Sequence, residues 1–478
     1  MTKTVKYYSS EDAGAPIVKQ GGWGHIVNLY RSICVGYNEK NFESILYNKT
    51  TKIININFAE SGHGYRKYQT ILIDALNTEY HNEELFILKV NSKNIQCRSK
   101  KVFSENLLTA STFKCKVAPL GMVESFTNGA GKSAFKFEDQ SESVYLCIND
   151  TQPTQFAWNS TSMLASPSIY MCKNLTELDG DADLTMPYND QFPNAHKESE
   201  WKTGASTQWG YGLANIMYQN AIYNSSGTSG QNNQNLNVGW KLIGNGSFHY
   251  LYLYINSFNQ IGTETVLYTF GAINKKYDYD KNNYIIKFAY NYNYLLESGQ
   301  FYQIYASSIN YNNYYFAFSP CVTNNIGTTY ISADRKVQYG SIKANRCIDS
   351  TSAYDLLIMK GINSEFRTSI FCYPKKWTQH AVSSSSNVSY PNFDGSTTFS
   401  KIGIYETGTY IERGTLPGAL WIHHNKPFND GTINKIIDDN NNELYTINLK
   451  HTSSPATSAN SVSLVDTHML IVLDSEYW

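Results

Sequence analysis

Residues 51–97 have the sequence TKIININFAESGHGYRKYQTILIDALNTEYHNEELFILKVNSKNIQC. Four short runs in it, TKIININF, TILID, ELFILKV and NIQC, are rich in β-branched and aromatic residues, and turns that contain Gly and Asn separate them. β-branched and aromatic side chains suit a half-buried pleated surface, whereas Asn, Asp and Gly suit tight turns. The pattern predicts strands, and we expect a small all-β module over residues 49–116.

The rest of the chain, residues 117–478, repeats this pattern on a larger scale. Strands are expected in the runs SAFKFED, SVYLCIND, VGWKLIG, FHYLYLYIN, TVLYTFG, NYIIKFAYNY, KIGIYETG, LYTINLK and HMLIVLD. Asn-Gly or Asp-Gly pairs begin at positions 128, 179, 245, 394 and 430, and such pairs are typical of hairpin turns. We expect one large β-sandwich-like domain here, with two sub-modules as an alternative. For the whole chain we predict a mainly β, multi-module antiparallel architecture of the sandwich or barrel-like type.

Residues 1–48 are expected to form an N-terminal arm and a short helix. The helix is predicted in GWGHIVNLYRSICVGYN, where apolar residues recur at helical spacing and Gly36 is placed to end the helix. Those apolar residues are Ile26, Val27, Leu29, Tyr30, Ile33 and Cys34. The preceding segment, which includes SSEDAGAPIV, is expected to be extended. Such an arm docks on a neighbouring subunit or packs on its own domain, and the sequence leaves both open.

The composition argues against several classes of function. The chain of 478 residues has a formal net charge of -1, and 17% of its residues are charged, which argues against a basic surface for nucleic acid. Its 8 cysteines are widely spaced, without a CxxC, so they match neither a small disulfide scaffold nor a zinc site. No apolar run approaches the roughly 18 residues that span a bilayer, and the first residues lack the apolar core of a signal peptide. We expect a protein that folds in a reducing cytoplasm, without a nucleic-acid or membrane partner.

The stretch TNGAGKSAFKF, residues 127–137, contains GAGKS, which matches the second half of a nucleotide-binding loop. Phe126 stands where the first glycine of that motif belongs. The residues after Ser133 alternate between apolar and polar, whereas a phosphate-binding loop opens a helix whose amides hold the phosphates. We therefore predict a hairpin with its turn at Asn128-Gly129 and with Lys132 facing solvent, instead of a nucleotide site.

Two further groups of residues could bind a metal, and neither has the full pattern that a metal site requires. Asp179, Asp181 and Asp183 alternate as in the opening of a calcium loop, but the usual glycine and glutamate are missing from the sixth and twelfth positions. His423 and His424 are adjacent, and adjacent residues of a strand point to opposite faces. The sequence also lacks the H-E-x-x-H and G-x-S-x-G motifs. We predict no catalytic, cofactor-binding or metal-binding residue, no cofactor and no enzymatic activity.

Several segments, taken in order along the chain, resemble a family of tailed-bacteriophage virion structural proteins. They are KYYSSEDAGAPIVKQGGWGHIVNLYRSICVGYN with its AGAP element, SGHGYRKYQTILIDALNTEYHNEELFILKV with its Gly-His-Gly turn, GMVESFTNGAGKSAFKF followed by SVYLCINDTQ, VGWKLIGNGSFHYLYLYIN, YTFGAINKKYDYDKNNYIIKFA, ERGTLPGALWIHH with an R-G-x-L-P-G turn, and VLDSEYW with its final Trp. Gly271-Ala272 replaces the family's usual Gly-Asp. The segments are short, and the strength of the resemblance lies in their order.

The resemblance implies a structural component of a virion, assembled in the host cytoplasm, at the neck or collar, the tail or the capsid surface. Such a protein would form a symmetric homo-oligomer and bind other virion proteins through its N-terminal arm and the edges of its β-modules. The alternative is a receptor-binding or fibre-attached virion protein, in which the polar loops 222–237 and 382–398 contact host-surface glycan. An enzyme, either a glycan depolymerase or an ATPase acting through GAGKS, is the third hypothesis.

Overall fold

A computed structural model gives the fold of the chain. It describes residues 4–19, 24–99, 101–104, 107–128, 131–138, 143–150, 168–172, 237–256, 263–281, 283–288, 356–360, 369–375, 399–406, 412–422, 431–438, 440–451, 467–473 and 477–478. Within these residues the chain forms 24 strands and the helix α1 (His25–Val35). The predicted mainly β fold, with antiparallel sheets and a barrel, is confirmed. No helix in the described ranges combines the length and the apolar character that a membrane span needs.

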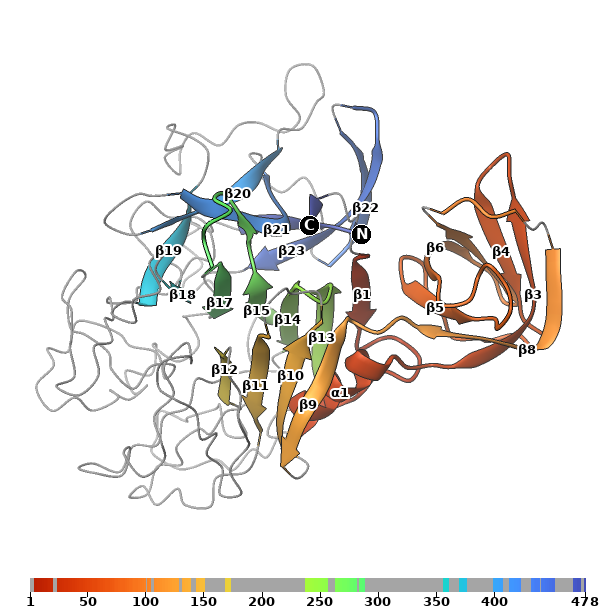
Figure 1. Ribbon diagram of the computed structural model, residues 1–478, viewed down its shortest axis with the longest axis horizontal. Coiled ribbons are helices and arrows are strands. Elements are labelled where there is room, and N and C mark those ends of the chain that lie inside the picture. The colour runs from red at the N-terminus through yellow and green to blue at the C-terminus, as the bar shows by residue number, and fades with distance from the viewer. Residues whose placement is uncertain are drawn as a thin grey trace, which may run out of the picture.

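Six strands close into a barrel, which lies to one side of the other elements in Figure 1, in the order β3-β4-β7-β6-β5-β8. They are β3 (Lys40–Asn48), β4 (Ile53–Asn57), β5 (Thr70–Asp74), β6 (Glu84–Val90), β7 (Asn94–Arg98) and β8 (Leu107–Val117). The predicted runs TILID and ELFILKV coincide with β5 and β6. Alternate side chains fill the barrel, as Ile54 and Ile56 of β4 do. β8 pairs with both β3 and β5, and this pairing closes the barrel. The barrel therefore begins at Lys40, because it includes β3 in addition to the strands expected at 49–116.

A sheet of 14 strands forms the largest part of the described chain. Its members are β1 (Lys6–Ser9), β2 (Val18–Lys19), β13 (Asn237–Gly244), β14 (Phe248–Asn256), β15 (Thr263–Ala272), β16 (Asn274–Lys275), β17 (Tyr284–Phe288), β18 (Leu356–Lys360), β19 (Ser369–Lys375), β20 (Phe399–Glu406), β21 (Glu412–Ile422), β22 (Ile433–Ile437), β23 (Glu443–His451) and β24 (Thr467–Val472). Its main path runs from β1 and β13 at one end to β23 and β22 at the other.

The N-terminal segment completes this large sheet instead of extending away from it. β1 pairs antiparallel with β13, so that Lys6 lies opposite Gly244 and Ser9 opposite Lys241. β2 pairs with the other end of β13. One core cluster contains Val5 and Tyr7 from the N-terminus together with residues of β23 and β24. Of the two dockings left open by the sequence, the arm here packs on its own chain.

A third sheet has the strand order β12-β11-β10-β9 and packs against α1. Its strands are β9 (Met122–Asn128), β10 (Lys132–Phe137), β11 (Tyr145–Asn149) and β12 (Ser168–Cys172). The predicted helix is confirmed, and Gly36 ends it with a φ of 82° and an amide hydrogen bond to the carbonyl of Ser32. Tyr30 of α1 packs on Phe135 of β10 and shares a 2.8 Å hydrogen bond with His249 of β14. The helix therefore lies between two sheets.

Lys132 and Ser133 of GAGKS begin β10, which forms a hairpin with β9, and Lys132 pairs with Asn128. Asn128 is the last residue of β9, and Gly129 of the predicted turn lies outside the described residues. The residues after GAGKS form a strand where a phosphate-binding loop would open a helix, so the predicted hairpin is confirmed. The prediction that Lys132 faces solvent is wrong, because the residue is only 7% exposed. β10 is an interior strand flanked by β9 and β11, and both of its faces are covered, which the local alternation of the sequence does not reveal.

Asp150, directly after β11, caps α1 from 124 positions away along the chain. Its Oδ2 accepts a hydrogen bond from the Ile26 amide at 2.7 Å, and its carbonyl accepts one from the Gly24 amide at 2.8 Å. A carboxylate suits the amide end of a helix. Burial nevertheless raises the pKa of Asp150 from 3.8 to about 7, because the loss of solvation outweighs the hydrogen bonds from Ile26 and Gly24.

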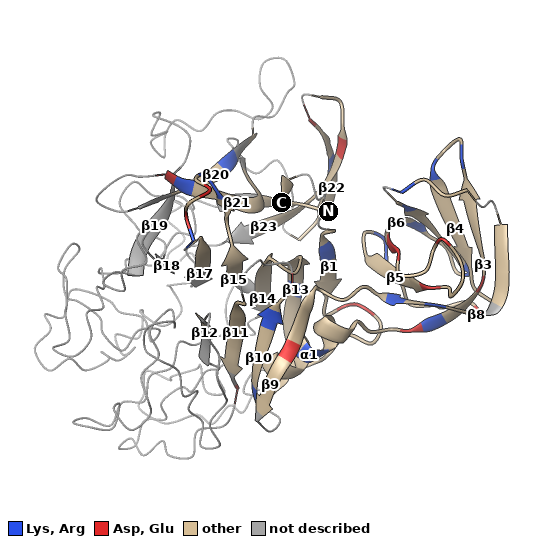
Figure 2. Ribbon diagram, in the orientation of Figure 1, with Lys and Arg blue, Asp and Glu red and all other residues tan. Residues whose placement is uncertain are grey.

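Charged residues of both signs are interspersed along the described elements (Figure 2). Several form ion pairs near the barrel surface, such as Lys101 with Glu83 and Lys114 with Glu39, the latter at 3.0 Å. Exposed pairs of this kind contribute little to stability. The described surface therefore presents mixed charge, in keeping with the net charge of -1.

Candidate functional site at the joint between barrel and sheet

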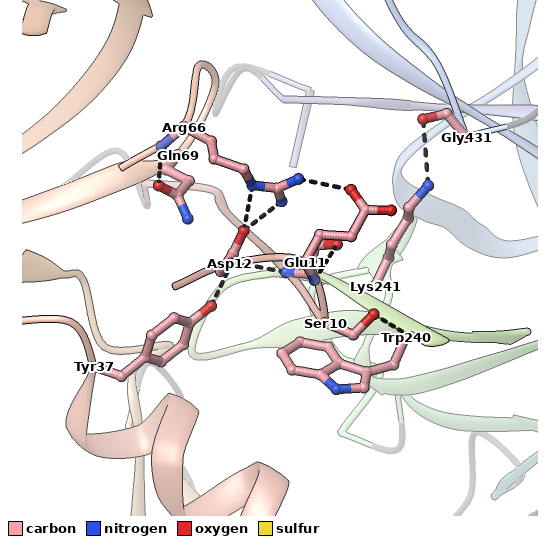
Figure 3. A network of polar contacts seen from close by, with 10 residues as sticks. Ser10, Glu11, Asp12, Tyr37, Arg66, Gln69, Trp240, Lys241 and Gly431 are labelled. Carbon is pink, nitrogen blue, oxygen red and sulfur yellow. Dashed lines mark hydrogen bonds and ion pairs between the residues drawn. The ribbon is translucent and has the colours of Figure 1, made fainter. Parts of the chain in front are cut away.

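The segment between β1 and β2 lies where the barrel meets the large sheet (Figure 3). We call this region the joint and define it as residues 9–16 with Tyr37, Arg66, Gln69 and Trp240. On the side of the sheet, the Ser10 amide donates to the Trp240 carbonyl at 2.9 Å, and the indole Nε1 of Trp240 donates to the Pro16 carbonyl at 3.1 Å. Trp240 is fully buried. The AGAP element of the sequence is thus fixed to β13.

On the side of the barrel, Asp12 is the centre of the joint. Its buried carboxylate accepts hydrogen bonds from the Ser9 amide at 2.9 Å, the Tyr37 hydroxyl at 2.5 Å and the Arg66 Nε at 2.6 Å. Arg66 also forms an ion pair with Glu11 at 2.9 Å. Burial would lower the pKa of Arg66, but the negative charges of Asp12 and Glu11 raise it. The network therefore holds a charged guanidinium from the barrel against the N-terminal segment.

The Gly-His-Gly turn packs against the AGAP element at the same joint. A Cβ on Gly64 would lie 2.6 Å from the Cβ of Ala13, so only glycine allows this close approach. The Nδ1 of His63 accepts a hydrogen bond from the Tyr65 amide, and its Nε2 lies 2.9 Å from the Asn91 carbonyl oxygen. Its ring stacks on Phe58 at 4.5 Å. Both ring nitrogens contact main-chain groups, so this histidine stabilises the Gly-His-Gly turn.

A second cluster forms around the segment RGTLPG, residues 413–418. The resemblance implied a turn there, and that expectation is wrong, because the segment lies within β21. Its register against β20 shifts twice, and the resulting irregularity holds residues of turn type in a strand. A Cβ on Gly418 would lie 2.3 Å from the indole of Trp478, which folds back and donates through Nε1 to the Val472 carbonyl at 2.7 Å. The final Trp therefore packs onto the R-G-x-L-P-G segment.

Arg413 of the same segment forms a buried ion pair with Asp280. The guanidinium Nε and Nη2 donate to the two carboxylate oxygens at 2.8 Å and 3.0 Å, and both side chains are 0% exposed. A bidentate pair of this geometry fixes orientation as well as distance. It joins β21 to the turn that follows β16, across 133 positions of sequence.

Several residues singled out in the sequence lie outside the described residues. They are Asp179, Asp181, Asp183, His423 and His424, together with loop 382–398 and loop 222–237 apart from its last residue. Among the residues that the structure does describe, no group of three or more His, Cys, Asp or Glu side chains is arranged to hold a metal ion. Within the joint, hydrogen bonds and ion pairs direct the acidic groups at Arg66, Tyr37 and main-chain amides, so the arrangement is suited to fixing two β-units in place.

The joint yields a stability prediction. Replacing Asp12 by Ala should lower the free energy of unfolding by about 2 kcal/mol, because Arg66 and the Tyr37 hydroxyl lose a charged acceptor. Glu11→Gln is the matched control, since Glu11 binds the same guanidinium from a largely exposed position, and it should cost under about 1 kcal/mol. Urea unfolding followed by tryptophan fluorescence measures both. Equal losses in the two variants would contradict the central role of Asp12.

The residues that build both clusters come from distant parts of the chain, so pattern alone did not single them out as partners. The nearest signals were the glycines of AGAP and Gly-His-Gly, which mark close approaches of backbone. Arg413 and Asp280 gave no local signal of their pairing. No protein-family model, no curated protein and no solved structure matches this chain.

Proposed function

We propose that the protein is a non-enzymatic structural component of a tailed-bacteriophage virion, at the neck or collar, the tail or the capsid surface, and that it assembles as a symmetric homo-oligomer. The observation that carries the proposal is the joint, in which the buried carboxylate of Asp12 ties Arg66 of the barrel to the strand that completes the large sheet. Units in one chain ordinarily move relative to each other unless their interface is extensive. A closed ring needs identical contacts in every copy, and a fixed joint provides them.

The core supports the same proposal. One cluster of buried side chains runs through residues of the barrel, α1, the third sheet and the first strands of the large sheet. Ile71 of the barrel, Tyr30 of α1 and Leu251 of β14 all belong to it. A continuous apolar core resists shear between the parts because close-packed interiors transmit strain. Such a frame suits a particle component that must hold its shape under load.

The segments behind the resemblance also meet in space. AGAP and Gly-His-Gly meet at the joint, and R-G-x-L-P-G meets the final Trp at β21. These residues lie in the packed contacts between the β-units. Their placement supports a structural role for the segments, and it is the order of the segments that suggests the virion.

Strand edges offer the contacts that an oligomer needs. Among the described strands, β22 and β9 each end a sheet. β22 exposes Ile437 and carries the ion pair of Lys435 with Glu443, and the pairing of β9 with β10 contains a bulge. Charges and bulges on an edge hinder the addition of a further strand, so we expect a second copy to contact these edges through side chains and not by extending the sheet.

Two measurements test the proposal. Mass spectrometry of purified particles, from the phage that encodes the chain, should detect this protein at a copy number that is a multiple of a ring symmetry. Native mass spectrometry of the isolated protein should show one closed oligomer. Absence from the particle would contradict the virion assignment, and a concentration-independent monomer would contradict the assembly.

A further inference from the structure

The turn that follows β16 presents two stacked tyrosines at the surface. The rings of Tyr277 and Tyr279 have centroids 5.3 Å apart and planes within 20° of parallel. Tyr279 is 65% exposed. Most large aromatic side chains in the described residues fill the core, as Tyr30 and Tyr250 do. An exposed ring held parallel to its neighbour forms a flat apolar surface with a polar edge.

Hydrogen bonds within the turn and contacts with β21 hold this turn in one shape. The Asp280 amide donates to the Tyr277 carbonyl at 3.1 Å, and Lys275 Nζ donates to the Asp278 carbonyl at 2.8 Å. The Lys276 amide donates to the Arg413 carbonyl at 2.9 Å. The buried bidentate pair of Asp280 with Arg413 also ties this turn to β21.

The buried pair of Asp280 and Arg413 costs desolvation free energy that a turn without buried charges would not. Two charges buried together lose most of their hydration, and an apolar pair of similar size often gives equal or greater stability. What a buried bidentate pair supplies is orientation. Here the oriented element is the turn that carries Tyr277 and Tyr279, so the position of the two rings is fixed before any ligand arrives. A preformed surface lowers the entropy cost of binding.

The surroundings of the rings are polar and of mixed charge. Lys275 at the end of β16 and Asp278 on the turn are exposed, and Lys276 forms an ion pair with Glu412 of β21. A protein interface core is depleted in charged residues, and a nucleic-acid surface is predominantly basic. A pyranose ring instead has an apolar C–H face that fits one aromatic ring, and hydroxyl groups that fit nearby carboxylate and ammonium groups. Saccharide is the ligand class that this combination favours.

We propose that Tyr277 and Tyr279 form a saccharide-binding platform, with Lys275 and Asp278 as its hydrogen-bonding rim. Tyr279, the more exposed ring, stacks on the apolar face of a hexose. Asp278 accepts hydrogen bonds from sugar hydroxyls, and Lys275 donates to them. The platform goes beyond the structural role proposed above and does not depend on it, since binding is a property of the isolated chain.

The test uses the full chain and three probes: maltotriose, the β-1,4-linked trimer of N-acetylglucosamine, and a galactose-terminated trisaccharide. Saturation-transfer difference NMR should show transfer to at least one probe. Tyr279→Ala should weaken that binding by roughly tenfold, the value of one good aromatic contact. Tyr279→Phe should keep most of the affinity, because stacking needs the ring and not the hydroxyl. Leu76→Ala, which alters a side chain of similar exposure (67%) in the turn between β5 and β6, is the matched control.

Each result decides the matter. Failure of all three probes to bind the full chain overturns the platform, as does binding that survives Tyr279→Ala. A change in oligomeric state on Tyr279→Ala, without a change in saccharide binding, would assign the rings to a protein contact and also overturn it. The virion proposal fails on a different observation, the absence of the protein from particles, so the two are separable.

Discussion

Replacing Asp280 by Ala is expected to lower the free energy of unfolding by about 3–5 kcal/mol, the usual cost of breaking a buried ion pair. The substitution leaves the guanidinium of Arg413 charged and fully buried, with its 2.8 Å and 3.0 Å hydrogen bonds to the carboxylate gone. A buried charge that has lost its counter-charge is far less stable than the pair. Because the pair joins β21 to the turn after β16, the loss should reach the large sheet as a whole.

A double-mutant cycle measures the interaction between Asp280 and Arg413 separately from the other effects of replacing each side chain. Asp280→Ala combined with Arg413→Met removes both charges, and we expect it to recover most of the lost stability, since apolar replacement of a whole buried pair is often neutral. Glu412→Gln is the control, because Glu412 pairs with Lys276 between the same two elements but near the surface, where a pair contributes under about 1 kcal/mol. Urea unfolding measures Asp280→Ala, Arg413→Met, the double variant and Glu412→Gln. A double variant as unstable as Asp280→Ala would contradict the account.

The second large effect is a pH dependence carried by Asp150. Its pKa is about 7 in the folded chain and 3.8 as a free side chain, so the folded state holds the proton more tightly. A raised pKa contributes stability that is fully present below about pH 4 and is lost as the pH rises to about 7. Over that window the contribution falls by about 4 kcal/mol, at about 1.4 kcal/mol per unit. The folded chain should therefore be more stable in mild acid than at neutral pH as far as Asp150 is concerned, because the buried carboxyl is then uncharged.

Asp150→Asn isolates this contribution, because the amide keeps an oxygen for the Ile26 amide and does not titrate. Every other titrating group is common to the two proteins. The difference in unfolding free energy between them should therefore shift by about 4 kcal/mol between pH 4 and pH 8, in favour of Asp150→Asn at the higher pH. Denaturant titrations at half-unit steps of pH measure it. A difference that stays constant with pH would show that Asp150 does not titrate in this range.

The sequence predicted the elements that local pattern controls. The spacing of Ile26, Tyr30 and Ile33 gave α1, and Gly36 gave its end. TILID and ELFILKV gave β5 and β6 because strand runs bounded by turn residues carry their own signal. These predictions needed no knowledge of distant residues.

What the sequence could not show is which distant segments meet. β3 joined the barrel because β8 pairs with it, and β1 joined the large sheet through β13. The burial of Lys132 and the pairing of Arg413 with Asp280 likewise depend on neighbours far away in sequence. The Asp12–Arg66 contact, 54 positions apart, belongs to the same class. The turn that the resemblance implied at R-G-x-L-P-G is instead part of β21, and only the pairing of β21 with β20 and β24 makes this segment a strand.

The pairing of β1 with β13 imposes an order on synthesis. The barrel is complete once Val117 has left the ribosome, whereas β1 waits for the segment Asn237–Gly244. At 5–20 residues per second, that wait is on the order of ten seconds. Contacts between segments so far apart in the sequence also form slowly after both segments have been synthesised. During the interval the first strand of each nascent chain has no partner of its own, and on a polysome the nearest copy of β13 can belong to the chain ahead.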